Sequence, residues 1–128
     1  MISKTTMKWK KDIYENVRGG ITELLILRLL CERDMYGYEI RNTLAERTMK
    51  AFDLKEAALY GPLYRMSSRG LISSRKELVG EKRFRVYYHI EDEGIQYLEY
   101  GIEQIRCVFS GIMNLLDSEK EKENEHNG

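Results

Sequence analysis

The most constraining feature of this sequence is a short segment with helical spacing that leads directly into two alternating strands, over residues 53–90. At 100° per residue, Leu59, Leu63 and Met66 fall on one side of a helix. The other side has small or hydrogen-bonding residues, namely Ala57, Gly61, Tyr64 and Ser68. The segment therefore predicts a helix that is anchored in a core on one side and can approach another surface closely on the other.

Two strands around a turn at residues 79–82 are predicted to follow this helix, over Ile72–Leu78 and Arg83–Ile90. The second strand alternates between an apolar face of Phe84, Val86, Tyr88 and Ile90 and a polar face of Arg83, Arg85, Tyr87 and His89. We expect the apolar face to lie in the core and the arginine face to be open to a polyanion. The alternative is that these arginines only protect a sheet edge or increase solubility.

Charge is distributed unevenly, although 21 basic and 21 acidic residues give a formal net charge of zero. From Arg65 to Arg85, seven basic residues stand against two acidic ones, an excess of five positive charges. From Asp117 to the end, the excess is three negative charges. Phosphate neutralisation supplies much of the affinity for nucleic acids, so the net charge argues against such a partner and the basic stretch argues for one.

Two further helices are predicted upstream. Residues Ile21–Cys31 are apolar on nearly every side and should form a central helix that is covered from two directions; the interruptions are Thr22, Glu23 and Arg28. Residues Tyr36–Thr48 are amphipathic and predict a second helix.

The third helix has a predicted start and a predicted irregularity. Asp53 and Glu56 have the spacing of an N-terminal capping box. Pro62 lies well inside the helix, where its ring removes one backbone hydrogen bond. Two interpretations are open: a single kinked helix, or two short turns joined at Gly61-Pro62.

A heptad pattern dominates the C-terminal part of the chain. Its apolar residues are separated alternately by three and four positions: Ile95, Leu98, Ile102, Ile105, Phe109, Ile112 and Leu116. A helix packed on one globular body usually has a wider apolar face. This narrow seam therefore predicts a dimerisation helix at residues 91–118, with these seven side chains as the interface between two copies of the chain.

The two ends of the chain are predicted to lie outside the folded body. Residues 1–18 form a basic arm that is frayed at its start, with Trp9, Ile13 and Val17 at helical spacing for packing on a partner subunit. Gly19-Gly20 is expected to break that pattern. Residues 119–128 are rich in Glu and Lys and predict a disordered acidic tail.

Several functional classes are disfavoured. No apolar run reaches the ~20 residues of a membrane span and the start lacks the apolar region of a signal peptide, which predicts a cytoplasmic protein without membrane contact. Cys31 and Cys107 lie in helical apolar patterns and are interpreted as reduced residues in or near the core, with a disulfide between them as the alternative. His89 and His126 lack partners at ligand or catalytic spacing, so neither a metal, a cofactor nor an enzyme activity is predicted.

The order of three helices, two strands and a long helix predicts a mainly helical α+β fold, a winged helix-turn-helix at residues 19–90 with an appended dimerisation helix. Five motifs in this order then resemble the PadR family of bacterial transcriptional regulators. They are Arg18-Gly19 before the apolar helix, Tyr36-Gly37-Tyr38-Glu39-Ile40, Leu59-Tyr60 with Leu63 and Arg65, Gly70-Leu71-Ile72, and Tyr87-Tyr88 ahead of Gly94. The resemblance extends over about residues 17–116 and is to the short type with a single C-terminal helix.

The resemblance implies a homodimeric repressor whose third helix enters the major groove while the wing follows the flanking backbone. The expected DNA contacts are Tyr38, Lys55, Tyr60, Tyr64, Arg65, Lys82, Arg83 and Arg85. Where the family commonly has Gly-Thr-Leu-Tyr-Pro, this chain has residues 57–61 as Ala-Ala-Leu-Tyr-Gly, with proline one place later. The threonine hydroxyl usually available for DNA is absent, so an altered base preference is expected.

The leading hypothesis is a sequence-specific, ligand-responsive repressor that binds double-stranded DNA as a homodimer on a two-fold operator, with a small-molecule effector that the sequence does not identify. A second hypothesis is a protein-interaction module that has kept the winged-helix frame and lost DNA binding, in keeping with the zero net charge and Ala57-Ala58. A third is a small-molecule sensor without a DNA role, which the basic stretch disfavours. Salt-dependent binding to duplex DNA distinguishes the first from the other two.

Overall fold

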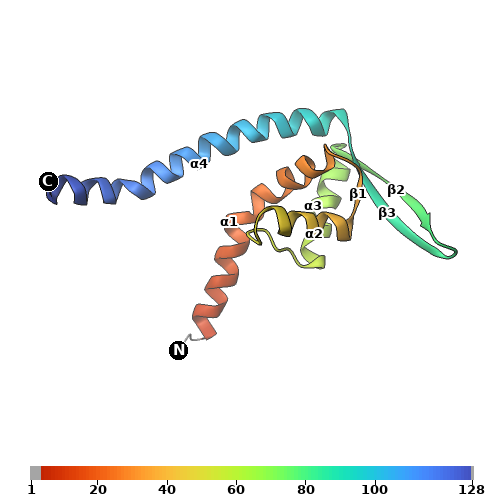
Figure 1. Cartoon of the computed structure of the whole chain (residues 1–128), viewed down its shortest axis with the longest axis horizontal. Helices are drawn as coiled ribbons and strands as arrows, with labels where there is room; N and C mark the ends of the chain where they lie inside the picture. The colour runs from red at the N-terminus through yellow and green to blue at the C-terminus, as the bar shows by residue number, and fades with distance from the viewer. Residues whose placement is uncertain (1–3, 128) are drawn as a thin grey trace.

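The computed structural model describes the backbone of residues 4–127 and the side chains of residues 9–118. Four helices and three strands follow one another: α1 (Lys4–Leu30), β1 (Met35–Tyr36), α2 (Gly37–Arg47), α3 (Glu56–Ser68), β2 (Ile72–Val79), β3 (Arg83–Ile90) and α4 (Asp92–Asn127). The strands form one antiparallel sheet in the order β1-β3-β2 (Figure 1). The predicted α+β, mainly α, class is confirmed. In the described part of the chain, no helix combines the length and the apolarity needed to cross a bilayer.

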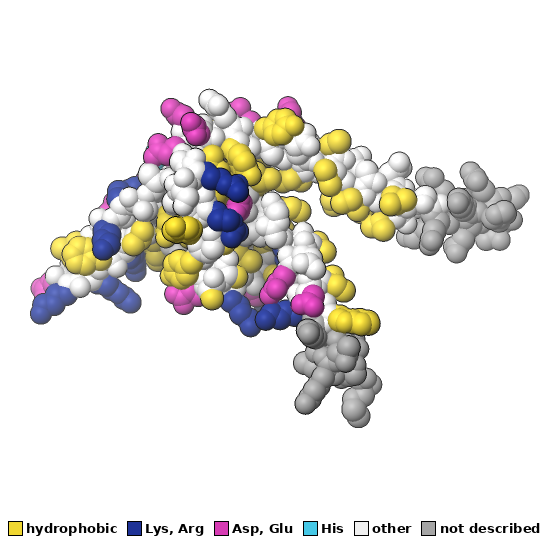
Figure 2. All heavy atoms as spheres, turned by 180° about the vertical axis from the view of Figure 1, so that it is seen from behind, with side chains coloured by type: hydrophobic (Ala, Val, Ile, Leu, Met, Phe, Trp, Pro, Cys, Tyr) yellow, Lys and Arg dark blue, Asp and Glu magenta, His cyan; other side chains and the backbone are white. Residues whose placement is uncertain are grey.

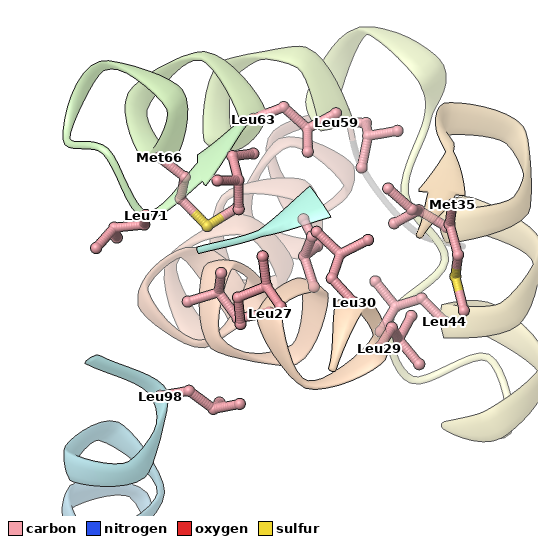
Figure 3. Close-up of a cluster of buried hydrophobic side chains, with 14 residues drawn as sticks. Leu27, Leu29, Leu30, Met35, Leu44, Leu59, Leu63, Met66, Leu71 and Leu98 are labelled. Carbon is pink, nitrogen blue, oxygen red and sulfur yellow. The ribbon is translucent and has the colours of Figure 1, made fainter. Parts of the chain in front are cut away.

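The core lies where α1, α2 and α3 meet the base of the sheet. Ile26 and Leu27 of α1 are completely buried. From α3, Leu59, Leu63 and Met66 point into the same cluster, as the helical spacing predicts (Figure 3). The opposite side of α3 is exposed along its whole length. The apolar side of α3 therefore orients the helix, and its small and polar side is left on the surface.

The short strand β1 is an element that the sequence analysis missed. Met35 pairs with Tyr88 and Tyr36 pairs with Tyr87, so β1 extends the hairpin to three strands. Residues 36–48 were predicted to form a helix that starts near Asp34 or Gly37, and α2 begins at Gly37. Two residues are too short to produce a periodic pattern, and only the pairing with β3 defines them as a strand.

The N-terminal half of α1 corrects a second expectation, because the helix runs through Gly19-Gly20 without a break. The glycines cost helix stability of about 1 kcal/mol each, which tertiary contacts can offset. Two such contacts lie just before the pair. The Asp53 amide donates to the Tyr14 hydroxyl at 2.9 Å, and the Arg18 guanidinium donates to the Ala51 carbonyl. Within the helix, the buried Thr22 hydroxyl spans the pair and donates to the Arg18 carbonyl at 2.9 Å.

The start of α3 differs from the predicted capping box. The residue that caps α3 is Lys55, and no side chain makes the capping hydrogen bond. Two contacts with other helices hold the segment before α3 instead. The Asp53 amide donates to the Tyr14 hydroxyl of α1, and Arg41 Nε of α2 donates to the Leu54 carbonyl at 3.1 Å. Pro62 is buried within one continuous helix, so the alternative of two separate turns is wrong.

Only the base of the wing belongs to the core. Ile72 and Ile90 are buried where the hairpin leaves the body. Towards the turn, Phe84 and Val86 are exposed, which contradicts the expectation that this whole face of β3 is core. The hairpin extends past the helices (Figure 1), so no second layer covers its outer half.

Helix α4 has two parts with different surroundings. Leu98 is buried and Ile102 packs against the core of the same chain, so the first part of the predicted dimer seam is used within the protomer. Beyond Ile105 the helix extends away from the body and its apolar side chains are exposed (Figure 1). The backbone stays helical through Asn127, where a disordered tail was predicted; Glu and Lys are good helix formers. The side chains of residues 119–128 lie outside the described residues.

Gly94 should be essential for docking α4 on the hairpin base. A Cβ atom at this position would lie 2.2 Å from the Leu71 carbonyl oxygen, which also accepts a hydrogen bond from the Glu91 amide at 2.9 Å. We expect Gly94→Ala to lower the free energy of unfolding by about 1–3 kcal/mol through this clash. Gly111→Ala is the matched control, because a Cβ there meets nothing within 4 Å; it should raise stability by about 0.5–1 kcal/mol. Urea titration measures both, and equal effects would contradict the packing.

Candidate nucleic-acid interface

The outer face of α3 is an exposed surface of two tyrosines set among small residues. Tyr64 is 75% exposed and Tyr60 lies one turn earlier, with its hydroxyl 3.3 Å from Glu56 Oε1. Ala57 and Gly61 are exposed beside them, and Lys55 is exposed at the helix N-terminus. Small residues let a helix backbone approach a partner closely, and the phenol groups of the two tyrosines can donate hydrogen bonds. This face has the chemistry to lie in a nucleic-acid groove.

Arg65 is occupied by a contact within the chain, which the sequence analysis did not anticipate. Its Nε donates to Glu23 Oε1 on α1 at 2.8 Å; Arg65 is 51% exposed and Glu23 only 12%. The guanidinium lies back along α3, so that a Cβ on Gly61 would be 3.3 Å from Arg65 Nη1. Arg65 thus ties α3 to α1 and does not extend freely from the outer face. The one signal was Glu23 itself, the single acidic residue in the largely apolar stretch of residues 21–31.

The arginine face of the wing is an assembly of stacked cations and aromatic rings. The Arg85 guanidinium lies 4.3 Å from the Tyr36 ring centre, and that of Arg75 lies 5.4 Å from the Tyr87 ring centre. Tyr36 packs edge-on against Tyr87 and stacks with Tyr38 of α2. Such contacts stabilise each cation by about 0.5–1 kcal/mol at exposed sites. The structure therefore groups Arg85 with Tyr38, at the junction of β1, β3 and α2.

Asp34 connects this face to the loop before β1. His89 Nδ1 lies 2.7 Å from Asp34 Oδ1, and Arg75 binds Oδ2 while its Nε donates to Glu77 Oε1 at 2.7 Å. Partial burial raises the pKa of Asp34, but the hydrogen bonds from His89 and Arg75 outweigh it, so the pKa lies below its usual value. The hydrogen bonds to Glu77 and Asp34 likewise raise the pKa of Arg75. Arg75 is locally neutralised, and its charge should not be counted as free for a polyanion.

The freely presented positive charge lies at the wing turn. Lys82 and Arg83 are both exposed next to Gly80, whose φ of +79° favours glycine in the turn. Lys76 and Arg69 are exposed as well. Of the seven basic residues between 65 and 85, these four contrast with Arg65, Arg75 and Arg85, which the chain itself engages. Figure 2 shows Lys and Arg side chains gathered around the outer end of the wing.

A cavity of about 600 Å³ separates the N-terminal half of α1 from α3. Small residues of both helices line it, including Gly19, Ala57, Ala58 and Gly61. Its charged lining has four basic and two acidic residues: Lys11, Arg18, Lys55 and Arg65, with Glu15 and Asp53. Arg18 lies flat against the Tyr14 ring, 3.7 Å from its centre. This size is in the range of pockets that hold small organic molecules.

The described residues offer neither a metal-binding group nor an activated cysteine. Within them, no group of three or more His, Cys, Asp or Glu side chains is arranged to hold a metal ion. Cys31 and Cys107 are both free and exposed, so the alternative of a disulfide is wrong, and so is their placement in the core. Partial burial raises the pKa of the Cys31 thiol, which favours the unreactive protonated form.

The model of the transcriptional regulator PadR-like family matches residues 26–100, from the C-terminal end of α1 into α4. That range is more than half of the chain and includes all three strands. The chain belongs to the PadR-like family. The resemblance in its motifs is thereby confirmed.

Solved PadR-like structures have the same fold. A transcriptional regulator from Clostridium thermocellum is 35% identical with a TM-score of 0.69, over 76% of this chain and 91% of that one. A PadR family regulator from Clostridium difficile is 32% identical with a TM-score of 0.65, over 74% and 97%. Bacillus subtilis PadR in complex with operator DNA is 26% identical with a TM-score of 0.60, over 64% of this chain and 46% of that one. The winged helix-turn-helix class is confirmed.

The structure divides the predicted contact residues of this PadR-like protein into four groups. Tyr60 and Tyr64 lie on α3, with Lys55 at its N-terminal cap, and Lys82 and Arg83 lie at the wing turn. Tyr38 and Arg85 belong to the aromatic junction, and Arg65 to the α1–α3 contact. Sequence reasoning missed the partners of the last two groups: Tyr36, Tyr87, Asp34 and Glu23. The pairing of β1 with β3 brings Tyr36 beside Tyr87, and Asp34 immediately precedes β1.

Proposed function

We propose that this PadR-like protein is a DNA-binding transcriptional repressor that reads its operator with α3 and contacts the flanking backbone with the turn of the wing. The observation that supports this most is the combination of an exposed, small-residue face on α3 with free Lys82 and Arg83 on the adjoining wing. The similarity to Bacillus subtilis PadR, whose structure was solved with operator DNA, supports the same role. Binding rather than catalysis is proposed, in the bacterial cytoplasm, where the DNA is accessible.

The proposed division of labour follows from the charges. Tyr60 and Tyr64 offer hydroxyl groups and rings to base edges in the major groove, where sequence can be read. Lys82 and Arg83 neutralise phosphates and give affinity that does not depend on sequence. Arg65 acts as a positioning residue, because its pairing with Glu23 holds the angle of α3 on α1.

Removing the two free cations of the wing should change the salt dependence of DNA binding. Each phosphate contact contributes about 0.9 to the slope of log K against log salt concentration. We expect Lys82→Ala with Arg83→Ala to flatten the slope for a random-sequence duplex by about 2 units, measured by fluorescence anisotropy.

The matched control is Arg106→Ala, which removes an exposed charge from α4 and should leave the slope unchanged. A wild-type protein that binds no duplex at low salt would overturn the proposed function in favour of the protein-interaction module. An unchanged slope in the double variant would overturn only the wing assignment.

We further propose that the protein acts as a homodimer on a two-fold operator, held together by the outer part of α4. Beyond Ile105, the exposed apolar side chains of this helix are Val108, Phe109, Ile112, Met113, Leu115 and Leu116. They form a broader stripe than the seven-residue seam, wide enough to pack against two partner helices. A second exposed stripe, Trp9, Ile13 and Val17, lies on α1. Figure 2 shows apolar side chains along both projecting helices, which a second copy would cover.

Phe109 is the best position at which to test the dimer, because it is 62% exposed and contributes little to the fold of one protomer. We expect Phe109→Asp to give monomers in light scattering, since a buried unpaired carboxylate costs several kcal/mol. DNA affinity for a two-fold site should fall with it. Asn114→Asp places the same charge on the opposite, exposed side of α4 and should stay dimeric. A dimeric Phe109→Asp would exclude the stripe as the interface.

A ligand-responsive role is supported by the cavity between α1 and α3, because α3 forms one of its walls. Arg18 and Lys55, which form no ion pair within the described residues, and the lining of small residues suit a small organic anion with an apolar body. A ligand there would contact the helix proposed to read DNA, and it could therefore change operator affinity only by favouring one placement of α3.

Filling the cavity tests this role. A Cβ on Gly19 or on Gly20 meets nothing within 4 Å, but only Gly19 lines the cavity. We expect 1-naphthoate to shift the backbone amide NMR signals of Gly19, Ala57 and Gly61 in the wild type and in Gly20→Leu, but not in Gly19→Leu. Naphthalene-1-methylamine should bind more weakly because of its positive charge. Equal shifts in both glycine variants would show that the cavity is not the site.

A further inference from the structure

The outer half of the wing presents a pair of apolar side chains that the fold does not cover. Leu78 of β2 and Phe84 of β3 are directly opposite each other in the strand register, and they are 57% and 65% exposed. Val86 continues the same face of β3 towards the body. Cross-strand packing of such a pair stabilises a hairpin by about 0.2–1 kcal/mol, which accounts for their adjacency. It does not account for a phenylalanine that leaves most of its surface in water.

The surroundings of this pair are basic. Lys82 lies in the turn just beyond it, Arg83 is the adjacent residue of β3 but on the opposite face, and Lys76 lies on the same face, two pairs closer to the body. Figure 2 shows an apolar patch next to Lys and Arg side chains at the outer end of the wing. An apolar centre with a positive rim is complementary to a polyanion that also has an apolar interior. Duplex DNA has this character, with stacked bases between two phosphate chains.

The pair lies on the same side of the sheet as the outer edge of α3. Tyr88 shares the face of β3 with Phe84 and Val86, because these residues alternate along the strand. Tyr88 is partly buried and packs against the core that Leu59, Leu63 and Met66 of α3 help to form. The apolar face of the wing therefore continues towards α3. The arginine face, with Arg75 and Arg85, lies on the other side of the hairpin.

We propose that Leu78 and Phe84 form an apolar wedge that enters the minor groove of the DNA and presses against a base-pair step. This inference rests on the proposed placement of α3 in the major groove, which brings the wing over the neighbouring minor groove. The minor groove is about 6 Å wide and too narrow for a two-stranded ribbon, but it admits side chains at the end of one. Lys82 and Arg83 are then adjacent to the phosphates on its two edges.

Such a wedge has two physical consequences that phosphate contacts do not have. Phenylalanine and leucine side chains inserted at a base step partly unstack it and kink the duplex, by about 20–90° in minor-groove proteins. An apolar contact displaces no counterions, so its loss lowers affinity without changing the salt slope. The wedge and the basic turn can therefore be separated by experiment, although they are neighbours in the hairpin.

The first test compares Phe84→Ser with Phe84→Leu and with Lys82→Ala/Arg83→Ala on one end-labelled 30-bp duplex. Burial of an apolar side chain of this size contributes about 1.5–3 kcal/mol, so Phe84→Ser should weaken binding at least about tenfold at every salt concentration, with the wild-type slope. The energy-transfer signal between the duplex ends should show less bending. Phe84→Leu should stay close to wild type, and the Lys82/Arg83 variant should lose slope instead.

A tryptophan reporter gives a direct test. Trp9 is the only tryptophan of the chain, so Trp9→Phe with Phe84→Trp places the single indole in the wedge. Its fluorescence should be quenched on addition of duplex, through stacking on bases, and protected from iodide. Circular dichroism should be unchanged in all variants, because Phe84 is exposed.

The outcomes are distinguishable from one another. Wild type that binds no duplex would overturn the proposed function itself. Wild-type affinity and bending in Phe84→Ser, or an indole that stays unquenched in a bound complex, would overturn the wedge and leave the function standing. A Phe84→Ser protein that becomes monomeric in light scattering would assign this face to a contact between copies, and that would also overturn the wedge.

Discussion

The packing of α3 on α1 is the constraint on which the rest of this molecule depends. Leu59, Leu63 and Met66 fill one side of α3, and they meet the fully buried Ile26 and Leu27. Rotating α3 by even one residue would bring polar or small side chains into the core, at a cost in both transfer free energy and cavity volume. The exposed tyrosine face is thus oriented by residues that never touch a partner. The ion pair of Arg65 with Glu23 adds an angular restraint at the same contact.

The positive charge that this protein offers to a partner is smaller than its sequence indicates, because several cations are already engaged within the chain. The basic stretch contains seven cations, yet Arg65 and Arg75 pair with carboxylates and Arg85 is stacked over Tyr36. Exposed pairs of this kind contribute little to stability, but each one reduces the field available to a polyanion. Of the four that remain free, Lys82 and Arg83 lie at the wing turn. A protein with no net charge can in this way present a positive end to DNA.

The long helix α4 packs on the body of its own protomer with its first turns and presents an uncovered apolar stripe with its later turns. The regular heptad pattern of the sequence does not distinguish these two parts. Its first turns bury Leu98 against the body, and Gly101 allows close approach, since a Cβ there would lie 2.4 Å from Leu24. Its later turns leave a broad apolar stripe without cover in the protomer. A single rigid element therefore connects the core of the reading domain to the proposed dimer contact, so the spacing of two α3 helices would depend on α4.

The sequence by itself determined the order of the four helices and the two hairpin strands, the buried side of α3 and the family, because helical spacing, strand alternation and short motifs are local properties of the chain. Tertiary structure alone decided what depends on contacts between distant segments. It paired Met35–Tyr36 with β3, carried α1 through two glycines, and assigned Arg65 to Glu23. It also left Phe84 in solvent, because alternation marks a face as apolar, whereas only a second layer of structure can bury it.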